Sequence, residues 1–144
     1  MTIYLDTSSL IKLFVEEEGS ESVRQLIDGA DVVATSVVAY PEARAALARL
    51  RREGRLTQAK FVSAKRELEE QWPAYLSLEL TGELGRAAGD LAERYRLRGY
   101  DGVHLASFAE VVRRSGLRDA AFSSFDDRLN RAARSLARAL GRSR

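Results

Sequence analysis

The sequence lacks cysteine entirely, which excludes a disulfide scaffold, a thiolate zinc site and a cysteine nucleophile. Its single histidine, His104, excludes any mechanism that needs two imidazole groups. No apolar run approaches the roughly 20 residues that a membrane-spanning helix requires. The first residues, MTIYLDTSSL, lack the basic start of a secretory signal peptide and already contain an aspartate. We therefore expect a cytoplasmic protein that does not cross a membrane.

The residues that are present have the balance of a soluble globular protein. Of the 144 residues, 45% are hydrophobic and 31% are charged, which is not the composition of a disordered chain. A chain of this length buries roughly two-thirds of its surface on folding, so a hydrophobic core can stabilise it without disulfides or a structural metal. We predict a single domain over residues 1–144.

Basic side chains gather in two segments, although the formal net charge is only +2. Residues 44–66 hold eight basic side chains and one acid, and residues 131–144 hold five arginines and no acid. Such clusters bind polyanions through phosphate contacts. Charge alone favours the plainer interpretation, a solvated helix face. The second segment belongs to a basic C-terminal helix and tail predicted at about 127–144.

Short apolar segments alternate with helical periodicities along the chain. Strands are predicted at 3–5, 31–35, 75–80 and 120–123, and helices at 9–16, 20–28, 39–53, 57–71, 82–97, 102–115 and 126–140. Short strands separated by helices are typical of a parallel sheet that is covered on both faces. The predicted fold class is therefore α/β.

Four acidic residues stand at or soon after the ends of predicted strands or at the starts of helices. Asp6 follows the first strand, Asp126 follows the fourth, Glu42 lies in the first turn of the helix after the second, and Asp101 precedes a helix. In open parallel sheets the functional site lies at the carboxyl ends of the strands. We expect these four carboxylates to converge on that edge.

The alternative for each aspartate is helix capping, which stabilises a helix by roughly 1 kcal/mol and needs no catalysis to explain it. Glu42 is harder to explain as a surface residue, because its helical neighbours Ala39 and Ala46 are small and apolar. As a set, four carboxylates in one pocket would repel one another strongly unless protons or cations neutralised them. Oxygen-only clusters suit hard ions such as Mg²⁺ or Mn²⁺, which support phosphodiester hydrolysis.

Other polar residues accompany these acids. The hydroxyls of Ser8 and Ser124 flank two of them and either orient a carboxylate or water or cap a helix. His104 stands three residues after the third acid, as an outer hydrogen-bond partner or as a partly buried helix residue. The sequence does not decide whether Asp126 or the adjacent Asp127 points inward.

Four motifs together resemble those of the PIN-domain ribonucleases, and among them the VapC toxins of bacterial toxin–antitoxin pairs. They are YLDTSSLIKL at 4–13, the glutamate in VAYPEARAAL at 38–47, LRGYDGVHLA at 97–106 and FSSFDDRL at 122–129. The resemblance covers roughly residues 2–137. It implies a three-layer α/β/α sandwich around a central parallel sheet of about four to five strands. It also implies an endoribonuclease that depends on Mg²⁺ or Mn²⁺, forms a homodimer and is inhibited by a cognate VapB antitoxin.

The resemblance also assigns roles to the acids. The first acid of the family falls on Asp6, its glutamate on Glu42, its third acid on Asp101, and its fourth on Asp126 in a Ser/Thr-x-Asp pattern. These four residues are expected to be catalytic and to hold one or two metal ions.

Two positions depart from the family pattern, and three arginines are assigned to RNA. Gly102 stands where alanine is commoner, and Ser124 replaces threonine but keeps the hydroxyl; we expect little effect from either. Arg44, Arg49 and Arg52 are candidate contacts for RNA phosphates.

Two alternatives to a nuclease come from other classes of protein. A phosphoacceptor switch domain also places aspartates at the edge of a parallel sheet, but it needs a lysine after a late strand, and Lys65 is the last lysine here. A non-catalytic module that binds RNA or protein through its arginine faces is the second. Nuclease assays with and without EDTA separate this module from an enzyme.

Overall fold

The protein, described here for residues 1–143 in a computed structural model, is built on a four-stranded parallel sheet. The strands are β1 (Thr2–Leu5), β2 (Val32–Ser36), β3 (Leu76–Leu78) and β4 (Ala120–Ser123), and their order in the sheet is β3-β2-β1-β4. All three strand pairs are parallel, as predicted.

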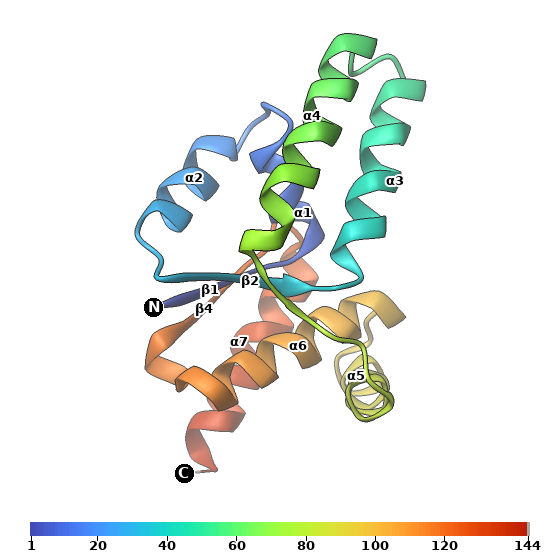
Figure 1. The fold of residues 1–144 in the computed structure, drawn as a ribbon. Helices are drawn as coiled ribbons and strands as arrows, with labels where there is room; N and C mark the ends of the chain where they lie inside the picture. The colour runs from blue at the N-terminus through green and yellow to red at the C-terminus, as the bar shows by residue number, and fades with distance from the viewer. Residues whose placement is uncertain (144) are drawn as a thin grey trace.

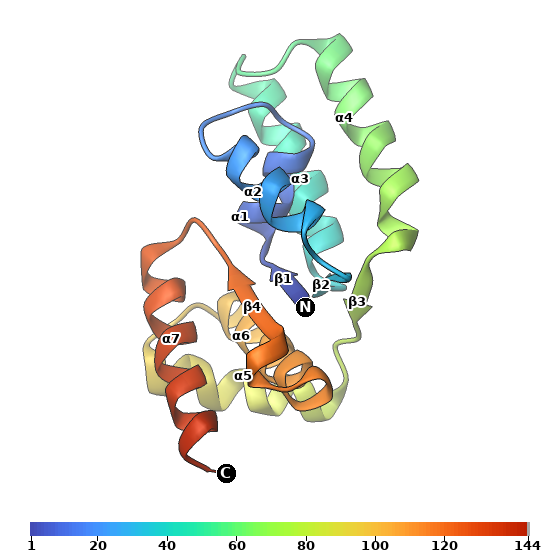
Figure 2. The ribbon, with the colours of Figure 1, turned by 90° about the vertical axis from the view of Figure 1, so that its left-hand side faces the viewer.

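Helices cover both faces of this sheet. They are α1 (Thr7–Leu10), α2 (Ser20–Asp28), α3 (Ala39–Arg52), α4 (Gln58–Gln71), α5 (Gly82–Tyr95), α6 (Gly99–Ser115) and α7 (Asp127–Arg142). Helices α1 to α4 lie on one side and α5 to α7 on the other (Figures 1 and 2). This arrangement confirms the predicted α/β/α sandwich. The predicted basic C-terminal helix is α7, and Arg144 lies outside the described residues.

The alternation of side chains along β1 divides the core between the two faces. Ile3 and Leu5 pack into the cluster under α1 to α4, whereas Tyr4 packs with Phe108 and Val111 of α6 on the opposite face. Successive residues of a strand point to opposite faces, and a strand buried on both faces is apolar throughout. The short run Ile3-Tyr4-Leu5 therefore folds as the central strand.

Three predicted boundaries are wrong, each for a local reason. The helix predicted at 9–16 begins at Thr7 and becomes a 3-10 turn at Ile11–Leu13. The following Phe14 and Val15 are buried in the core, so the chain must turn there. The strand predicted at 75–80 shortens to Leu76–Leu78, because its partner β2 ends at Ser36, opposite Leu78.

The third boundary, the start of α6, lies earlier than predicted and carries a close helix contact. The Gly102 amide donates to the Arg98 carbonyl at 3.0 Å, so the helix begins at Gly99. A Cβ atom at Gly102 would lie 2.5 Å from the Ala88 carbonyl oxygen of α5. The close packing of α5 on α6 therefore leaves no room for a Cβ atom at Gly102, beside Asp101.

The order of the strands places a crevice at one end of the sheet. From β1 the chain crosses to β2 on one side, and it later returns to add β4 on the other side. The carboxyl ends of β1 and β4 therefore flank the topological switch point, where ligands bind in open parallel sheets. None of the helices formed by residues 1–143 combines the length and apolarity needed to cross a membrane.

Candidate active site

A cleft of about 1080 Å³ opens between α5, the first turns of α6 and the start of α7. Its acidic lining residues are Glu42, Asp101, Asp126 and Asp127, its basic ones are Arg98, Arg128 and Arg131, and its apolar wall includes Leu80, Ala88 and Val103. Three of the four predicted acids thus line one cleft. The fourth, Asp6, is buried and is not among the lining residues.

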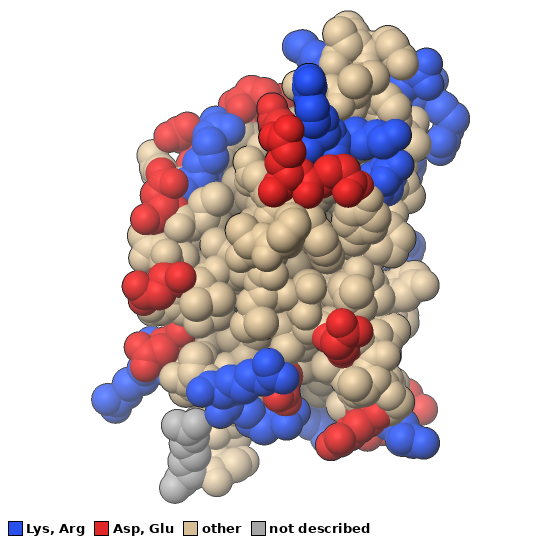
Figure 3. Space-filling view, viewed as in Figure 1, with Lys and Arg blue, Asp and Glu red and all other residues tan. Residues whose placement is uncertain are grey.

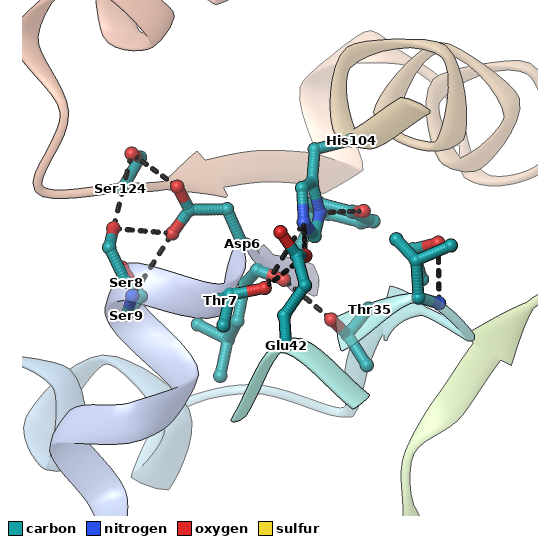
Figure 4. Close-up of polar contacts among 12 residues, drawn as sticks. Asp6, Thr7, Ser8, Ser9, Thr35, Glu42, His104 and Ser124 are labelled. Atoms are coloured by element: carbon teal, nitrogen blue, oxygen red, sulfur yellow. Dashed lines mark hydrogen bonds and ion pairs between the residues drawn. The ribbon is translucent and has the colours of Figure 1, made fainter. Parts of the chain in front are cut away.

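Asp6 lies at the carboxyl end of β1 and is held by donors from two parts of the chain (Figure 4). Its Oδ1 accepts hydrogen bonds from Ser8 Oγ at 2.7 Å and from the Ser9 amide at 3.0 Å. Its Oδ2 accepts one from Ser124 Oγ at 2.6 Å. Asp6 therefore caps α1, as the capping alternative predicted, and both predicted serines orient its carboxylate.

The pairing of β1 with β4 explains why Ser124 reaches Asp6. Leu5 is paired with Ser123, and the Asp6 amide donates to the Ser123 carbonyl at 3.1 Å, so Asp6 and Ser124 leave the sheet side by side. Burial raises the pKa of Asp6, while hydrogen bonds from the two serines oppose this rise. The charged form of Asp6 is thus supported mainly by hydrogen-bond donors, and within residues 1–143 it forms no ion pair that would offset the cost of burial.

Asp101 lies in the first turn of α6 and is not the residue that caps it, because the cap position is Arg98. The capping alternative is therefore wrong for Asp101. Partial burial raises its pKa, and the charges of Asp126, Asp6 and Glu42 raise it further. Asp101 is thus within electrostatic range of the other three predicted acids.

Glu42, in the first turn of α3, has one oxygen fixed and lines the cleft. Its Oε1 accepts hydrogen bonds from Thr7 Oγ1 at 2.6 Å and from His104 Nε2 at 2.8 Å. Burial by itself would raise the pKa of Glu42, but these bonds to His104 and Thr7 hold it below its ordinary value. His104 is therefore a buried residue that is connected to the cleft by its hydrogen bond to Glu42.

Asp126 caps α7 and lines the cleft at the same time. Its Oδ1 accepts a hydrogen bond from the Leu129 amide at 3.1 Å, and its own amide donates to Ser124 Oγ at 3.0 Å. Capping and metal binding are compatible because a carboxylate has two oxygens. Asp127 also lines the cleft, but only Asp126 is among the groups that raise the pKa of Asp101.

Among the described residues, 1–143, the aspartates of the site form no ion pair with a basic side chain, and this holds for Asp6, Asp101 and Asp126 alike. In the same part of the chain, no three His, Cys, Asp or Glu side chains are already gathered as ligands of one metal ion. The donors are all oxygens and their charge is uncompensated, which fits a hard divalent cation that would draw the carboxylates together.

The arginines predicted to hold RNA lie elsewhere. Arg44, Arg49 and Arg52 are on α3, and none of them lines the cleft. Arg44 pairs with Glu69 of α4, and Arg49 pairs with Glu53. Figure 3 shows basic side chains over the outer ends of α3 and α4, at the end of the molecule away from α5 to α7.

The arginines that do line the cleft are Arg98, Arg128 and Arg131, and all three are exposed. Of these three, only Arg131 lies in one of the two basic segments of the sequence, 131–144. A signal was available, since Arg98 stands three residues before Asp101 and the other two soon follow Asp126. Sequence reasoning also missed Thr7, which directly follows Asp6.

Comparisons with known proteins agree with this arrangement. The family model described as PIN domain matches residues 3–135. Two relatives from Mycobacterium tuberculosis, Ribonuclease VapC45 of strain CDC 1551 and Ribonuclease VapC49 of strain H37Rv, are each 43% identical over 109 residues. Each match covers 76% of this chain and 76% of the relative.

Two crystal structures share the fold at low sequence identity. PAE2754 from Pyrobaculum aerophilum superposes with a TM-score of 0.64 at 22% identity, over 98% of this chain and 90% of that one. The Mycobacterium tuberculosis toxin VapC20, described as cleaving the sarcin-ricin loop, superposes with a TM-score of 0.61 at 21% identity. That match covers 86% of this chain and 91% of VapC20.

Proposed function

The chain belongs to the PIN-domain family, and from this premise we propose that it is a metal-dependent endoribonuclease of the VapC toxin type. Its substrate is RNA, in which it hydrolyses phosphodiester bonds. The observation that carries the proposal is that Glu42, Asp101 and Asp126 line one cleft and that Asp6 ends β1 at the same edge of the sheet, while no ion pair within residues 1–143 involves these aspartates. The names of the two M. tuberculosis relatives support the same activity.

In the proposed site, Asp6, Asp101 and Asp126 hold one or two Mg²⁺ or Mn²⁺ ions. Such an ion, when bound, lowers the pKa of a water ligand and neutralises charge on the phosphate. Ser8 and Ser124 fix the orientation of the Asp6 carboxylate. Glu42 completes the site through Oε2, because Oε1 is occupied by two hydrogen bonds, and it binds a second ion or positions the attacking water.

The walls of the cleft suit a nucleic acid strand. Arg98, Arg128 and Arg131 provide bidentate donors for phosphates on either side of the scissile bond. Leu80 and Val103 offer apolar surface to a base or ribose. In this arrangement the acidic residues face the phosphate whose charge a bound metal would neutralise. The arginines bind the phosphates next to it.

The remaining expectations stay predictions. A homodimer and a cognate VapB-type antitoxin that neutralises the enzyme rest on the family, whereas a single domain and a cytoplasmic location rest on the length and composition of the sequence. Among the alternatives, the non-catalytic RNA-binding module is the one that the arginine-lined cleft also supports.

Metal removal tests the proposal directly. The purified protein should cleave RNA in the presence of Mg²⁺ or Mn²⁺, and EDTA should reduce cleavage to the level of buffer alone, because the carboxylates cannot position water or phosphate without a cation. Readdition of Mn²⁺ should restore the activity. Cleavage that persists in EDTA, or RNA binding without cleavage in either condition, would contradict the proposal.

Substitution of the cleft arginines should weaken RNA binding more than substitution of the arginines of α3. The double variant Arg128→Gln, Arg131→Gln should raise KM for RNA and flatten the logarithmic salt dependence of binding by about 1.4, since each phosphate contact on a single strand contributes about 0.7. The matched control is Arg49→Gln, Arg52→Gln, which removes the same charge outside the cleft. Equal effects of the two pairs would show that RNA does not follow the cleft.

A further inference from the structure

A chain of buried polar side chains connects the core of the protein to the cleft. The hydroxyl of Tyr4 lies 2.8 Å from His104 Nδ1, and His104 Nε2 lies 2.8 Å from Glu42 Oε1 (Figure 4). Thr7 Oγ1 lies 3.2 Å from the same imidazole nitrogen and donates to the same carboxylate oxygen. Tyr4 is fully buried and His104 is 2% exposed, so the chain is shielded from solvent until it reaches Glu42.

The chemistry of these groups decides which atoms carry protons. An ionised carboxylate only accepts hydrogen bonds, so the proton between His104 and Glu42 belongs to Nε2. A phenol is protonated at neutral pH, and burial raises the pKa of Tyr4 still further. A neutral imidazole that donates from Nε2 accepts at Nδ1, so the Tyr4 hydroxyl donates to Nδ1 when His104 is neutral. Both bonds then favour the same tautomer of His104, the one that donates to Glu42.

The chain is held rigidly at its inner end. The ring of Tyr4 stacks on Phe122 at a centroid distance of 5.7 Å and 7° between planes, and it contacts Phe108 at 6.3 Å. A core position that served packing alone would be filled as well by phenylalanine, without burying a hydroxyl. The polar atoms of Tyr4 and His104 instead point along one path that ends at the carboxylate of the cleft.

We propose that Tyr4 and His104 are positioning residues for Glu42, and the proposal rests on the function assigned above. Together with Thr7 they hold Glu42 Oε1 from β1, α1 and α6, three elements other than α3, which carries Glu42. The side chain cannot swing, so Oε2 stays turned to the cleft. Supporting residues of this kind, which orient a ligand by hydrogen bonding to it, typically contribute 10-fold to 100-fold to activity or metal affinity.

The tautomer of His104 can be measured without any catalytic assay. Because His104 is the only histidine of the chain, ¹⁵N labelling of histidine gives a spectrum of a single imidazole. At neutral pH the spectrum should show a protonated Nε2 and an unprotonated Nδ1. In Tyr4→Phe, which keeps the ring and removes the donor, Nε2 should stay protonated, and the ¹⁵N shift of Nδ1 should move to that of a nitrogen without a hydrogen bond. A protonated Nδ1 in the wild-type protein would overturn the proposal.

Turnover provides the second test. Tyr4→Phe should lower kcat on RNA by about 10-fold or more with little change in KM, since the hydroxyl acts on Glu42 and not on RNA. The control is Tyr75→Phe, because the Tyr75 hydroxyl bonds to Gln71 outside the cleft. In a Glu42→Gln background, Tyr4→Phe should cost less than about 2-fold, because both substitutions then act on one group.

The outcomes separate this inference from the proposed function. If the wild-type protein cleaves RNA and Tyr4→Phe cleaves it equally fast, the positioning role is overturned and the ribonuclease assignment stands. An equal loss in the wild-type and Glu42→Gln backgrounds would indicate a purely structural role and also overturn it. If the wild-type protein cleaves no RNA while His104 shows the Nε2–H tautomer, the ribonuclease assignment fails and the hydrogen-bond chain is supported.

Discussion

Asp6→Asn should reduce RNA cleavage by more than about 100-fold while the protein remains folded. The loss should exceed that of residues which only support a ligand, and those already contribute 10-fold to 100-fold. Asparagine has nearly the same shape as aspartate but replaces one anionic oxygen with an amide nitrogen that cannot bind a cation. The fold should survive because the substitution also removes a charge whose burial raises the pKa of Asp6.

Two measurements test this prediction. Initial cleavage rates with Mn²⁺ report the activity, and thermal melting curves report whether the protein is folded. A suitable control is Asp28→Asn, which removes an exposed carboxylate at the end of α2. The control should keep both the wild-type rate and the wild-type melting temperature. An Asp6→Asn protein that melts normally and cleaves RNA as fast as wild type would remove Asp6 from the site.

The second large effect concerns the response of stability to metal. Millimolar Mg²⁺ should raise the melting temperature of the wild-type protein, because the ion binds only the folded cleft. At 100 times its dissociation constant a ligand contributes about 2.7 kcal/mol. For a chain of this size that corresponds to roughly 5–10 °C. Asp101→Asn should lose most of this shift.

Without metal, the order of the wild-type and Asp101→Asn melting temperatures should reverse, for an electrostatic reason. The pKa of Asp101 is raised in the folded protein, so in the pH range between its unfolded and folded values the folded state binds more protons than the unfolded chain. Stability contributed at this site is therefore present at low pH, falls as the pH rises through that range, and stays reduced at neutral pH. Asp101→Asn lacks this penalty and should melt at or above the wild-type temperature in EDTA.

Differential scanning calorimetry between pH 4 and 8, with and without Mg²⁺, tests both halves of this expectation. The control is Asp119→Asn, an exposed aspartate at the opposite end of β4, and NaCl at matched ionic strength accounts for general screening. Equal Mg²⁺ shifts in the wild-type and Asp101→Asn proteins would place the metal elsewhere.

Local patterns in the sequence predicted the layers of the fold, and they also nominated the acidic residues of the candidate site. The apolar run Ile3-Tyr4-Leu5 predicts a strand buried on both faces, and an aspartate directly after it must emerge at the carboxyl edge. The same logic placed Glu42 in the first turn after β2. Asp101 was proposed from its position at the start of a predicted helix, and the family motif gave the same residue. These features depend on residues that are close together in the sequence, so the sequence is enough to predict them.

Contacts between distant segments were decided only by the tertiary structure. Arg44, Arg49 and Arg52 belong to the longer basic segment, yet α3 carries them away from the cleft, and the arginines that line the cleft lie at the start of α6 and on α7. The bond between Tyr4 and His104 joins residues 100 positions apart, and no spacing rule predicts it. Periodicity sets which face of a helix is apolar, whereas the packing of helices on the twisted sheet sets which polar groups meet.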